Sequence, residues 1–302
     1  MSDDPSTLSS AECYWRDRQP WLEECGYMLH AQRGHVLDAA RSSDGKYIFL
    51  SSEPLASDPR NHCVPLLDVL RDPEDGDICL LVMSMLRRCN NAPFVTVGEA
   101  IEFFQQAFEG LLFIHEHNVA HRDTMLLNIM LDPTPMFHNM YHFASTKYYA
   151  RTERPPKYFW TDFGLSQRYN PETSSSRELP ILGGDKSAPE HQGVSYNVPC
   201  DPMPTDVYYL GNLIRENFLQ NLKYANMRFM QPLVDDMVCN NPAERPTMDE
   251  IRKKLHWWNL RARRLVRRSE WCIVRPVLGT IHVFRTARYI AKRLPAVPTP
   301  SA

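Results

Sequence analysis

The stretch HRDTMLLNIM, residues 121–130, contains residue types that serve phosphoryl transfer. Asp123 is a carboxylate that can accept the proton of an attacking hydroxyl group. Asn128 follows five residues later, and its amide oxygen is a ligand type that hard divalent cations accept. A second carboxylate, Asp162, comes directly after the run YFWT. Phosphoryl transfer needs aligned reactants and neutralised phosphate charge, so these residue types raise the question of whether the chain has a phosphoryl-transfer site.

Segments with strand character occupy the first part of the chain. Short apolar runs, among them HVLDAARS, DGKYIFLSS, CVPLLDVL and DICLLVMSML, alternate with turn signals. The Asp44-Gly45 pair predicts a hairpin turn, so residues 26–51 are expected to form a small antiparallel sheet. Residues 1–19 are polar and are expected to be a disordered N-terminus.

Helical patterns follow from residue 96 onward. TVGEAIEFFQQAFEGLLFIHEH has one apolar face, and Thr96 and Glu99 have the spacing of a capping box. DVYYLGNLIRENFLQN, MRFMQPLVDDMVC and TMDEIRKKLHWWNL predict three more helices, the last with Thr247 and Glu250 as a capping box. Residues 131–157 lack periodicity and are expected to be a solvated insertion or a basic, aromatic contact surface. A small β-rich part before a larger α-rich part predicts an α+β fold.

Five short motifs occur in a fixed order along the chain: HRD with Asn128, DFG at 162–164, APE at 188–190, DVYYLG at 206–211 and NPAERPTMDEI with Arg245. Together they resemble the C-terminal lobe of a eukaryotic protein kinase over roughly residues 96–255. Longer stretches of the sequence, including SSEPLASDPRNHCVPLLDVL and GGDKSAPEHQ, are similar to the sequences of kinase-like proteins from fungi. The resemblance implies a two-lobed fold that binds ATP and Mg²⁺ between the lobes.

The resemblance also implies a role for each matching residue. Asp123 matches the catalytic base, and Asn128 and Asp162 match the two Mg²⁺ ligands. The adenine would lie near the stretch from Met83 to Leu86, with Met83 and Met85 in contact with the nucleotide. Structural support is implied for seven further residues: His121, Arg122, Phe163, Gly164, Glu190, Asp206 and Arg245. Among these, Glu190 and Arg245 match a buried ion pair, Asp206 braces the HRD segment, and the His121 imidazole packs near Phe163.

The N-terminal part departs from the kinase pattern. No G-x-G-x-x-G occurs between Trp21 and Arg41, and Lys46 lies only one residue past the turn. Glu53, the sole acid that could pair with such a lysine, is next to Pro54. A segment of roughly twenty residues is missing relative to the pattern, through a deletion or a wrongly assigned splice site. The HRD segment itself has Met125 and Leu127 where kinases often carry a phosphate-facing cation.

These observations leave two main functions open. The chain is either an ATP- and Mg²⁺-dependent kinase of protein Ser/Thr hydroxyls with weak activity, or a pseudokinase that serves as a binding or scaffold module. In both cases the kinase-like domain is expected over residues 20–256, with an N-lobe at 20–86 and a C-lobe at 87–256. Thr173, Ser174, Ser175 and Ser176 are candidate phosphorylation sites whose added charge would pair with Arg122.

Composition limits the remaining classes. The 302 residues are 43% hydrophobic and 23% charged, and the longest nearly apolar run has nine residues, too few to span a membrane. The eight cysteines form no CxxC pair, which argues against a zinc site or a disulfide framework. His115 and His117 form an HxH with no third ligand nearby, which favours a polar helix end over a metal site. A soluble protein of a reducing compartment, the cytoplasm or nucleus, is expected.

The charge is distributed unevenly. Residues 251–302 contain thirteen Lys and Arg against one acid, Glu270, a net charge of +12. The basic extension at 257–302 could bind an anionic partner such as nucleic acid or membrane lipid. The favoured alternative is that it folds back onto the acidic body and buries its apolar residues. These are Trp257, Trp258, Trp271, Ile273, Val277, Ile281, Val283 and Phe284.

Overall fold

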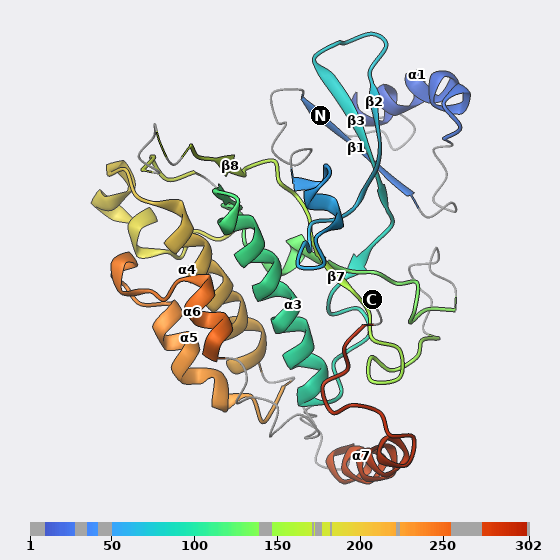
Figure 1. The fold of residues 1–302 in the computed structure, drawn as a ribbon, viewed down its shortest axis with the longest axis vertical. Helices are drawn as coiled ribbons and strands as arrows, with labels where there is room; N and C mark the ends of the chain where they lie inside the picture. The colour runs from blue at the N-terminus through green and yellow to red at the C-terminus, as the bar shows by residue number, and fades with distance from the viewer. Residues whose placement is uncertain are drawn as a thin grey trace, which may run out of the picture.

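The computed structural model of the protein describes residues 10–27, 35–41, 50–138, 147–170, 172, 177–181, 183–221, 224–254 and 274–300. These residues form a mixed arrangement of helices and small antiparallel sheets. Figure 1 shows a three-stranded sheet and helix α1 at one end of the molecule, helices α3 to α6 in its body and helix α7 at the opposite end. As predicted, the first strands of the described residues precede the main helices, but α1 precedes the sheet and further short strands follow α3.

The three-stranded sheet has the order β1-β3-β2 and is antiparallel throughout. Its strands are β1 (His35–Arg41), β2 (Leu66–Arg71) and β3 (Ile78–Ser84). β3 is the central strand and buries Leu80, Leu81 and Val82, which explains its nearly continuous apolar sequence. A strand was predicted at each of these three places. The hairpin predicted at Asp44-Gly45 lies outside the described residues.

Helix α1 (Ser10–Glu24) corrects the expectation that residues up to 19 are disordered. Tyr14 Oη donates to Asp72 Oδ2 at 2.6 Å, and Arg18 Nη2 donates to Asp72 Oδ1 at 3.1 Å. Burial opposes ionisation of Asp72, but the hydrogen bonds from Arg18 and Tyr14 outweigh it and lower the pKa of this carboxyl to about 2. The helix is therefore fixed by an acid 54 residues downstream of Arg18, which a local sequence pattern does not reveal.

Helix α3 (Val97–Glu116) begins where the sequence predicts. Thr96 Oγ1 accepts from the Glu99 backbone N–H at 3.2 Å, and the Glu99 carboxylate accepts from the Thr96 N–H, so the capping box is confirmed. The apolar face of the helix is buried in the main core, as expected from its period. The buried residues of that face include Ile101, Phe104, Phe108, Leu111 and Leu112.

Helices α4, α5 and α6 pack beside α3 in the body of the molecule (Figure 1). α4 spans Pro202–Ile214 and continues as a π-helical turn, Arg215–Leu219. It begins four residues earlier than predicted because the Asp201 side chain caps it and Pro202 occupies its first position. α5 covers Gln231–Met237 and α6 covers Met248–Lys254. Thr247 and Glu250 form the predicted capping contacts at the start of α6.

Short strands connect the body to the sheet end. β4 (Arg87–Arg88), β6 (Ile129–Leu131) and β7 (Tyr158–Trp160) form one antiparallel sheet in the order β4-β6-β7. β5 (Val119–Ala120) pairs with β8 (Gln167–Arg168). The chain from 121 to 128 leaves β5 and enters β6, while the chain from 161 to 166 leaves β7 and enters β8. The two segments that carry Asp123 and Asp162 are therefore neighbours.

Part of the expected solvated insertion is buried. Arg151 is 2% exposed, and its guanidinium donates to the backbone oxygen of Cys89 at 2.7 Å and lies 4.2 Å from the centre of the Phe94 ring. Thr152 Oγ1 donates to Glu99 Oε1 at 2.8 Å. A buried guanidinium must have hydrogen-bond partners, and Arg151 has them. Arg151 is therefore a structural residue of the core and not an exposed basic contact.

Helix α7 (Val274–Ala291) shows that the C-terminal extension folds back only in part. Tyr289 is 4% exposed, and Arg288 Nη2 lies 2.8 Å from Glu153 Oε1. The expectation of buried apolar side chains was wrong for four of them, because Val277, Ile281, Val283 and Phe284 are exposed. Trp257, Trp258, Trp271 and Ile273 lie outside the described residues. None of the helices in the described ranges combines the length and apolar character needed to cross a bilayer.

Candidate active site

The 121–128 segment joins Asp123 to Asn128 directly. Asn128 Nδ2 donates to Asp123 Oδ2 and to the Asp123 backbone oxygen, both at 2.9 Å. A short 3-10 turn, Leu126–Asn128, brings the amide back to the carboxylate before β6 begins. Asn128 is 6% exposed, so its position is fixed by the surrounding chain. The two residues singled out in the sequence are therefore hydrogen-bonded to each other.

Asp206 on α4 fixes the shape of this segment. Its Oδ2 accepts from the His121 backbone N–H at 2.7 Å, and its Oδ1 accepts from the Arg122 N–H at 2.7 Å. Thr124 Oγ1 donates to Oδ1 at 3.1 Å, and His115 Nε2 lies 3.1 Å from Oδ2. Burial opposes its ionisation, but these donors outweigh burial and lower the pKa of Asp206. Arg122 has a φ of 67°, a left-handed conformation that the two N–H bonds hold in place.

The DFG triplet approaches the same segment from β7. The Thr161 N–H donates to the Asn128 backbone oxygen at 2.9 Å, so Asp162 follows a residue that is bonded to Asn128. The His121 ring lies 5.0 Å from the Phe163 ring, centre to centre, and its Nε2 is 3.1 Å from the Thr161 oxygen. Burial lowers the pKa of His121, which keeps the ring neutral. Asp162 has a φ of 60°, and a Cβ added at Gly164 would lie 3.4 Å from Asp162 Oδ1.

The oxygen atoms around this junction have the chemistry of a Mg²⁺ site. Both amide hydrogens of Asn128 are used by Asp123, which leaves the Asn128 carbonyl oxygen to bind a cation. Asp162 adds a carboxylate one residue beyond Thr161. Among the described residues there is no group of three or more His, Cys, Asp and Glu that could hold a metal without further ligands. Two oxygen ligands with the remainder from phosphate and water is the arrangement that Mg²⁺ commonly takes in nucleotide sites.

The HxH sequence at the end of α3 is used structurally. His115 Nε2 contacts Asp206, and His117 Nδ1 lies 2.7 Å from the Phe113 backbone oxygen. These contacts agree with the expectation of a polar helix end.

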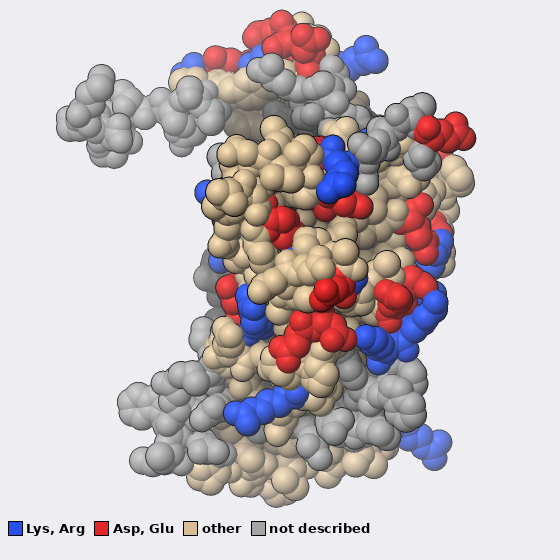
Figure 2. Space-filling model, turned by 90° about the vertical axis from the view of Figure 1, so that its left-hand side faces the viewer, with Lys and Arg blue, Asp and Glu red and all other residues tan. Residues whose placement is uncertain are grey.

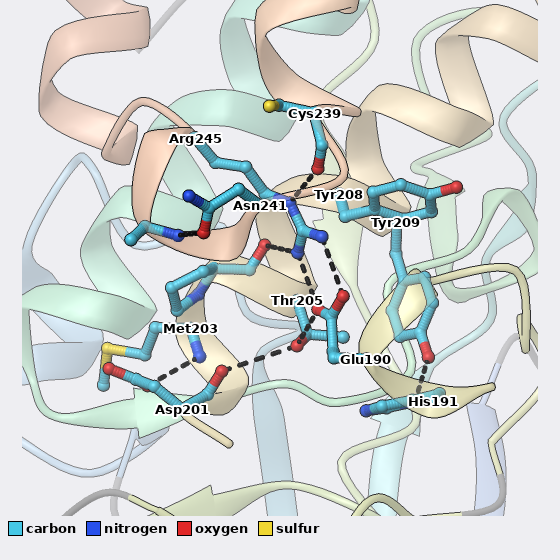
Figure 3. A network of polar contacts seen from close by, with 12 residues as sticks. Glu190, His191, Asp201, Met203, Thr205, Tyr208, Tyr209, Cys239, Asn241 and Arg245 are labelled. Atoms are coloured by element: carbon cyan, nitrogen blue, oxygen red, sulfur yellow. Dashed lines mark hydrogen bonds and ion pairs between the residues drawn. The ribbon is translucent and has the colours of Figure 1, made fainter. Parts of the chain in front are cut away.

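A buried ion pair fixes the segment after the APE motif (Figure 3). Arg245 Nη1 and Nη2 donate to the two carboxylate oxygens of Glu190 at 2.6 and 2.7 Å. Thr205 Oγ1 donates to Glu190 Oε1 at 2.7 Å, and Arg245 Nε donates to the Cys239 backbone oxygen at 2.8 Å. Burial opposes ionisation of Glu190, but the bonds from Arg245 and Thr205 outweigh it and lower its pKa. The bidentate geometry matches the pair expected from sequence.

The stretch from Met83 to Leu86 leads from β3 to β4. Met83 pairs with Val36 of β1 and Leu66 of β2, and Met85 is 8% exposed. β4 then pairs with β6, the strand that follows Asn128. This connection brings the chain after Met83 from the sheet toward the 121–128 segment, although Met85 points into the interior.

Two curated proteins are similar to this chain. The light-sensor protein kinase of Ceratodon purpureus is 24% identical over 171 residues, which are 52% of this chain and 12% of that protein. The serine/threonine-protein kinase CAK1 of Saccharomyces cerevisiae is 30% identical over 143 residues, which are 45% of this chain and 33% of that protein. The chain is distantly similar to protein kinases. The matched segments span about a third or less of these relatives, and no protein-family model matches the chain.

Two contacts of this kinase-like site were not predicted from the sequence. The Gly184 N–H donates to Asp123 Oδ1 at 2.8 Å, and a Cβ at Gly184 would lie 2.5 Å from Met125 Sδ. The Gly183-Gly184 pair, which precedes the APE motif, was the available signal for such a close approach. Arg122 Nη1 lies 2.9 Å from Glu178 Oε1, and only the acidic residue type of Glu178 could have suggested this pair.

Proposed function

We propose that the chain is a protein-kinase-like phosphotransferase that transfers the γ-phosphoryl group of ATP to Ser or Thr hydroxyls of a protein substrate. The observation that carries this proposal is the joined set Asp123, Asn128 and Thr161-Asp162, held by hydrogen bonds of 2.9 Å. The distant similarity to two protein kinases supports the same reaction class. On this proposal residues 20–256 form a two-lobed domain, with a truncated small lobe at 20–86 and a large lobe at 87–256.

Asp123 would act as the base in this reaction. One oxygen accepts from Asn128 and the other from Gly184, so the carboxylate is oriented at both ends. A carboxylate offers about four acceptor sites, which leaves room for the hydrogen of a substrate hydroxyl. Asp123 would receive that proton as the hydroxyl oxygen attacks phosphorus.

Asn128 and Asp162 would hold the cation and, through it, the phosphates. Mg²⁺ supplies neutralisation of the phosphate charge when bound. The free carbonyl oxygen of Asn128 and the carboxylate of Asp162 are hard ligands of the required type. Met83 and Met85, at the end of β3, are proposed to contact the adenine.

Glu190 and Arg245 would fix the segment that meets the protein substrate. Their bidentate pair is buried and tied to Thr205 on α4. His121, Phe163 and Gly164 would set the position of Asp162, and Asp206 would set that of Asp123. These are positioning roles, since the contacts reach Asp123 and Asp162 through the backbone.

The second candidate is a pseudokinase, a binding module that keeps this scaffold with little turnover. It is favoured by β1, the strand beside β3, whose sequence HVLDAAR contains no lysine. Glu53 is exposed and accepts from Ser57 Oγ at 2.6 Å. Without a lysine to position the phosphates, turnover would fall by orders of magnitude. Lys46 lies outside the described residues.

A reducing compartment inside the cell, cytoplasm or nucleus, is proposed for either function. The seven described cysteines are all free thiols.

Thermal unfolding with ATP, in the presence and absence of Mg²⁺, tests nucleotide and metal binding. We expect a rise in Tm with ATP that requires Mg²⁺ and that disappears in Asp162→Ala. Asp249→Ala, which changes a half-buried acid on α6, is the matched control and should keep the rise. The absence of any shift in the wild-type protein would overturn the ATP and Mg²⁺ proposal.

Phosphotransfer to a generic Ser/Thr substrate separates the two candidates. Incorporation of phosphate that is abolished by Asp123→Asn and by Asp162→Ala, and retained by Asp249→Ala, supports the kinase. A Mg²⁺-dependent Tm shift without phosphotransfer supports the pseudokinase.

A further inference from the structure

Helix α7 exposes an apolar stripe along one side. Val277, Ile281 and Phe284 follow the i, i+4, i+7 spacing of one helix face and are 53%, 46% and 73% exposed. Val283 and Ile290 are 65% and 56% exposed, but they lie on a different side of the helix. Single exposed apolar residues are ordinary on protein surfaces, but Val277, Ile281 and Phe284 together form an apolar stripe along one face of the helix.

The charge on this helix has one sign. The described segment 274–300 contains five basic residues and no acid: Arg275, Arg285, Arg288, Lys292 and Arg293. It belongs to the region from 251 to 302, whose net charge is +12. The apolar stripe runs from Val277 to Phe284, and four of the five basic residues lie at or beyond Arg285. An apolar stripe next to cationic side chains is complementary to a binding partner whose surface is anionic and whose interior is apolar.

Other side chains of the same segment hold the helix on the body. Tyr289 is buried, Arg288 and Lys292 lie 2.8 and 3.5 Å from Glu153 Oε1, and Ala296 and Val297 pack against the main core after the helix ends. α7 forms the end of the molecule farthest from the β1-β3-β2 sheet (Figure 1). In Figure 2 the described atoms at the lower end of the molecule, the end that carries α7 in Figure 1, are mostly uncharged and have Lys and Arg side chains near them. The stripe can therefore meet a large flat partner without obstruction from the sheet.

A pocket of about 680 Å³ lies between α7 and the body. It is lined by Ile281 and Phe284 of the stripe together with His282, Arg285 and Arg288. The apolar stripe therefore continues into a space whose walls carry positive charge from Arg285 and Arg288 and one carboxylate, Glu153, which pairs with Arg288.

From these features we infer that α7 binds the surface of an anionic lipid bilayer, with Val277, Ile281 and Phe284 inserted below the headgroups and the basic residues in contact with them. Nucleic acid is less suitable, because phosphate backbones are met by charge and hydrogen bonds and leave an aliphatic stripe in water. The helix would lie in the interface and not span it, in agreement with its length and charge. This inference is independent of the proposed phosphotransfer.

Cosedimentation of the full chain with vesicles tests the inference. Vesicles of phosphatidylcholine alone are compared with vesicles that also contain phosphatidylserine, each at low and high salt. We expect binding only to the anionic vesicles, and weaker binding as salt screens the contact. Phe284→Ser and Val277→Ser should each reduce the partition coefficient about tenfold, since each removes an apolar side chain from the bilayer contact.

Val194→Ser is the matched control, because Val194 is a 91% exposed valine on a turn far from α7 in sequence. It should bind like the wild type, and all variants should keep the wild-type Tm because the replaced side chains are exposed. Equal binding to both vesicle types, no binding to either, or full binding by Phe284→Ser would each overturn the inference. Binding of duplex DNA that Phe284→Ser leaves unchanged, with no vesicle binding, would instead assign the basic region to nucleic acid.

Discussion

Arg122 and Glu178 form a partly buried ion pair, with Arg122 Nη1 2.9 Å from Glu178 Oε1. Glu178 is fixed at its backbone as well, since its N–H donates to the Cys200 oxygen at 3.0 Å and its oxygen accepts from the Cys200 N–H at 2.9 Å. A permanent acid therefore occupies the position beside Arg122 where phosphorylation of residues 173–176 was expected to bring negative charge. Thr173, Ser174, Ser175 and Ser176 themselves lie outside the described residues.

The first prediction concerns this pair. Glu178→Gln removes the charge beside Arg122 and keeps the shape, so residues 177–181 should exchange their amide hydrogens faster and any phosphotransfer should slow. Glu172→Gln, an exposed acid of the same segment, is the control and should change neither. Phosphatase treatment of the wild-type protein should leave its rate unchanged. A rate that falls after phosphatase treatment would assign the charge to a phosphate group.

The second prediction concerns the carboxylate that fixes the 121–128 segment. In Asp206→Asn, one acceptor oxygen is replaced by an N–H group that faces the donors of His121, Arg122 or His115. Because the site is fully buried, we expect the free energy of unfolding to fall by about 3 kcal/mol. Asp249→Asn on the surface of α6 is the control and should stay close to wild type. Chemical denaturation measures both, and equal losses would contradict the assignment.

The third prediction is a pH dependence. Burial raises the pKa of Glu102 on α3 to about 7, with Gln106 and His62 opposing the rise and Glu109 adding to it. Between pH 4.5 and about 7, Glu102 is therefore protonated in the folded chain and ionised in the unfolded chain, where its pKa is 4.5. The contribution of Glu102 to the free energy of unfolding is fully present below pH 4.5 and is lost as the pH rises through about 7. Below about pH 7 the folded chain therefore contains Glu102 in its protonated form.

Glu102→Gln removes this ionisation and keeps the acceptor for Gln106, whose Nε2 lies 2.9 Å from Glu102 Oε1. We expect the variant to exceed the wild type in stability by about 2 kcal/mol above pH 7 and to equal it near pH 4.5. Urea denaturation across this range measures the difference. If the free energies of unfolding of the wild type and the variant differed by the same amount at every pH, Glu102 would not titrate as described.

The fourth prediction concerns the approach of α3 to β7. A Cβ at Gly110 would lie 2.6 Å from Trp160 Cδ1 and 2.7 Å from His62 Cβ, so Gly110→Ala must displace packed side chains. We expect a loss of about 1–3 kcal/mol, despite the better helix propensity of alanine. Gly279→Ala is the control, because that helical glycine has nothing within 4 Å of the added Cβ. It should keep or raise Tm, and a fall as large as that of Gly110→Ala would contradict the packing argument.

Local patterns predicted much of the fold. The capping boxes at Thr96 and Thr247 depend on residues three apart, and both formed as expected. The β2 and β3 strands follow from apolar runs and turn residues within one short segment. Asp123 and Asn128 are five residues apart, so their contact was also accessible from spacing.

The remaining contacts depend on residues far apart in the sequence. α1 is fixed by Asp72, and Arg122 meets Glu178 56 residues later, at separations where spacing carries no information. Gly184 reaches Asp123 across 61 residues. The exposed side of α7 was missed for another reason. The tendency of apolar residues to be buried describes averages and does not identify which face of a helix is covered.

The Glu190–Arg245 pair also sets an order of events during synthesis. The chain leaves the ribosome with its N-terminus first, so Asp123, Asn128 and Asp162 are outside before Arg245 has been made. Glu190 precedes Arg245 by 55 residues and has no guanidinium partner until that part of the chain emerges. The candidate site residues are therefore present on the nascent chain before the ion pair between Glu190 and Arg245 can form. Protease should cut residues 183–201 in a chain arrested before Arg245 and leave them intact once α6 has been released.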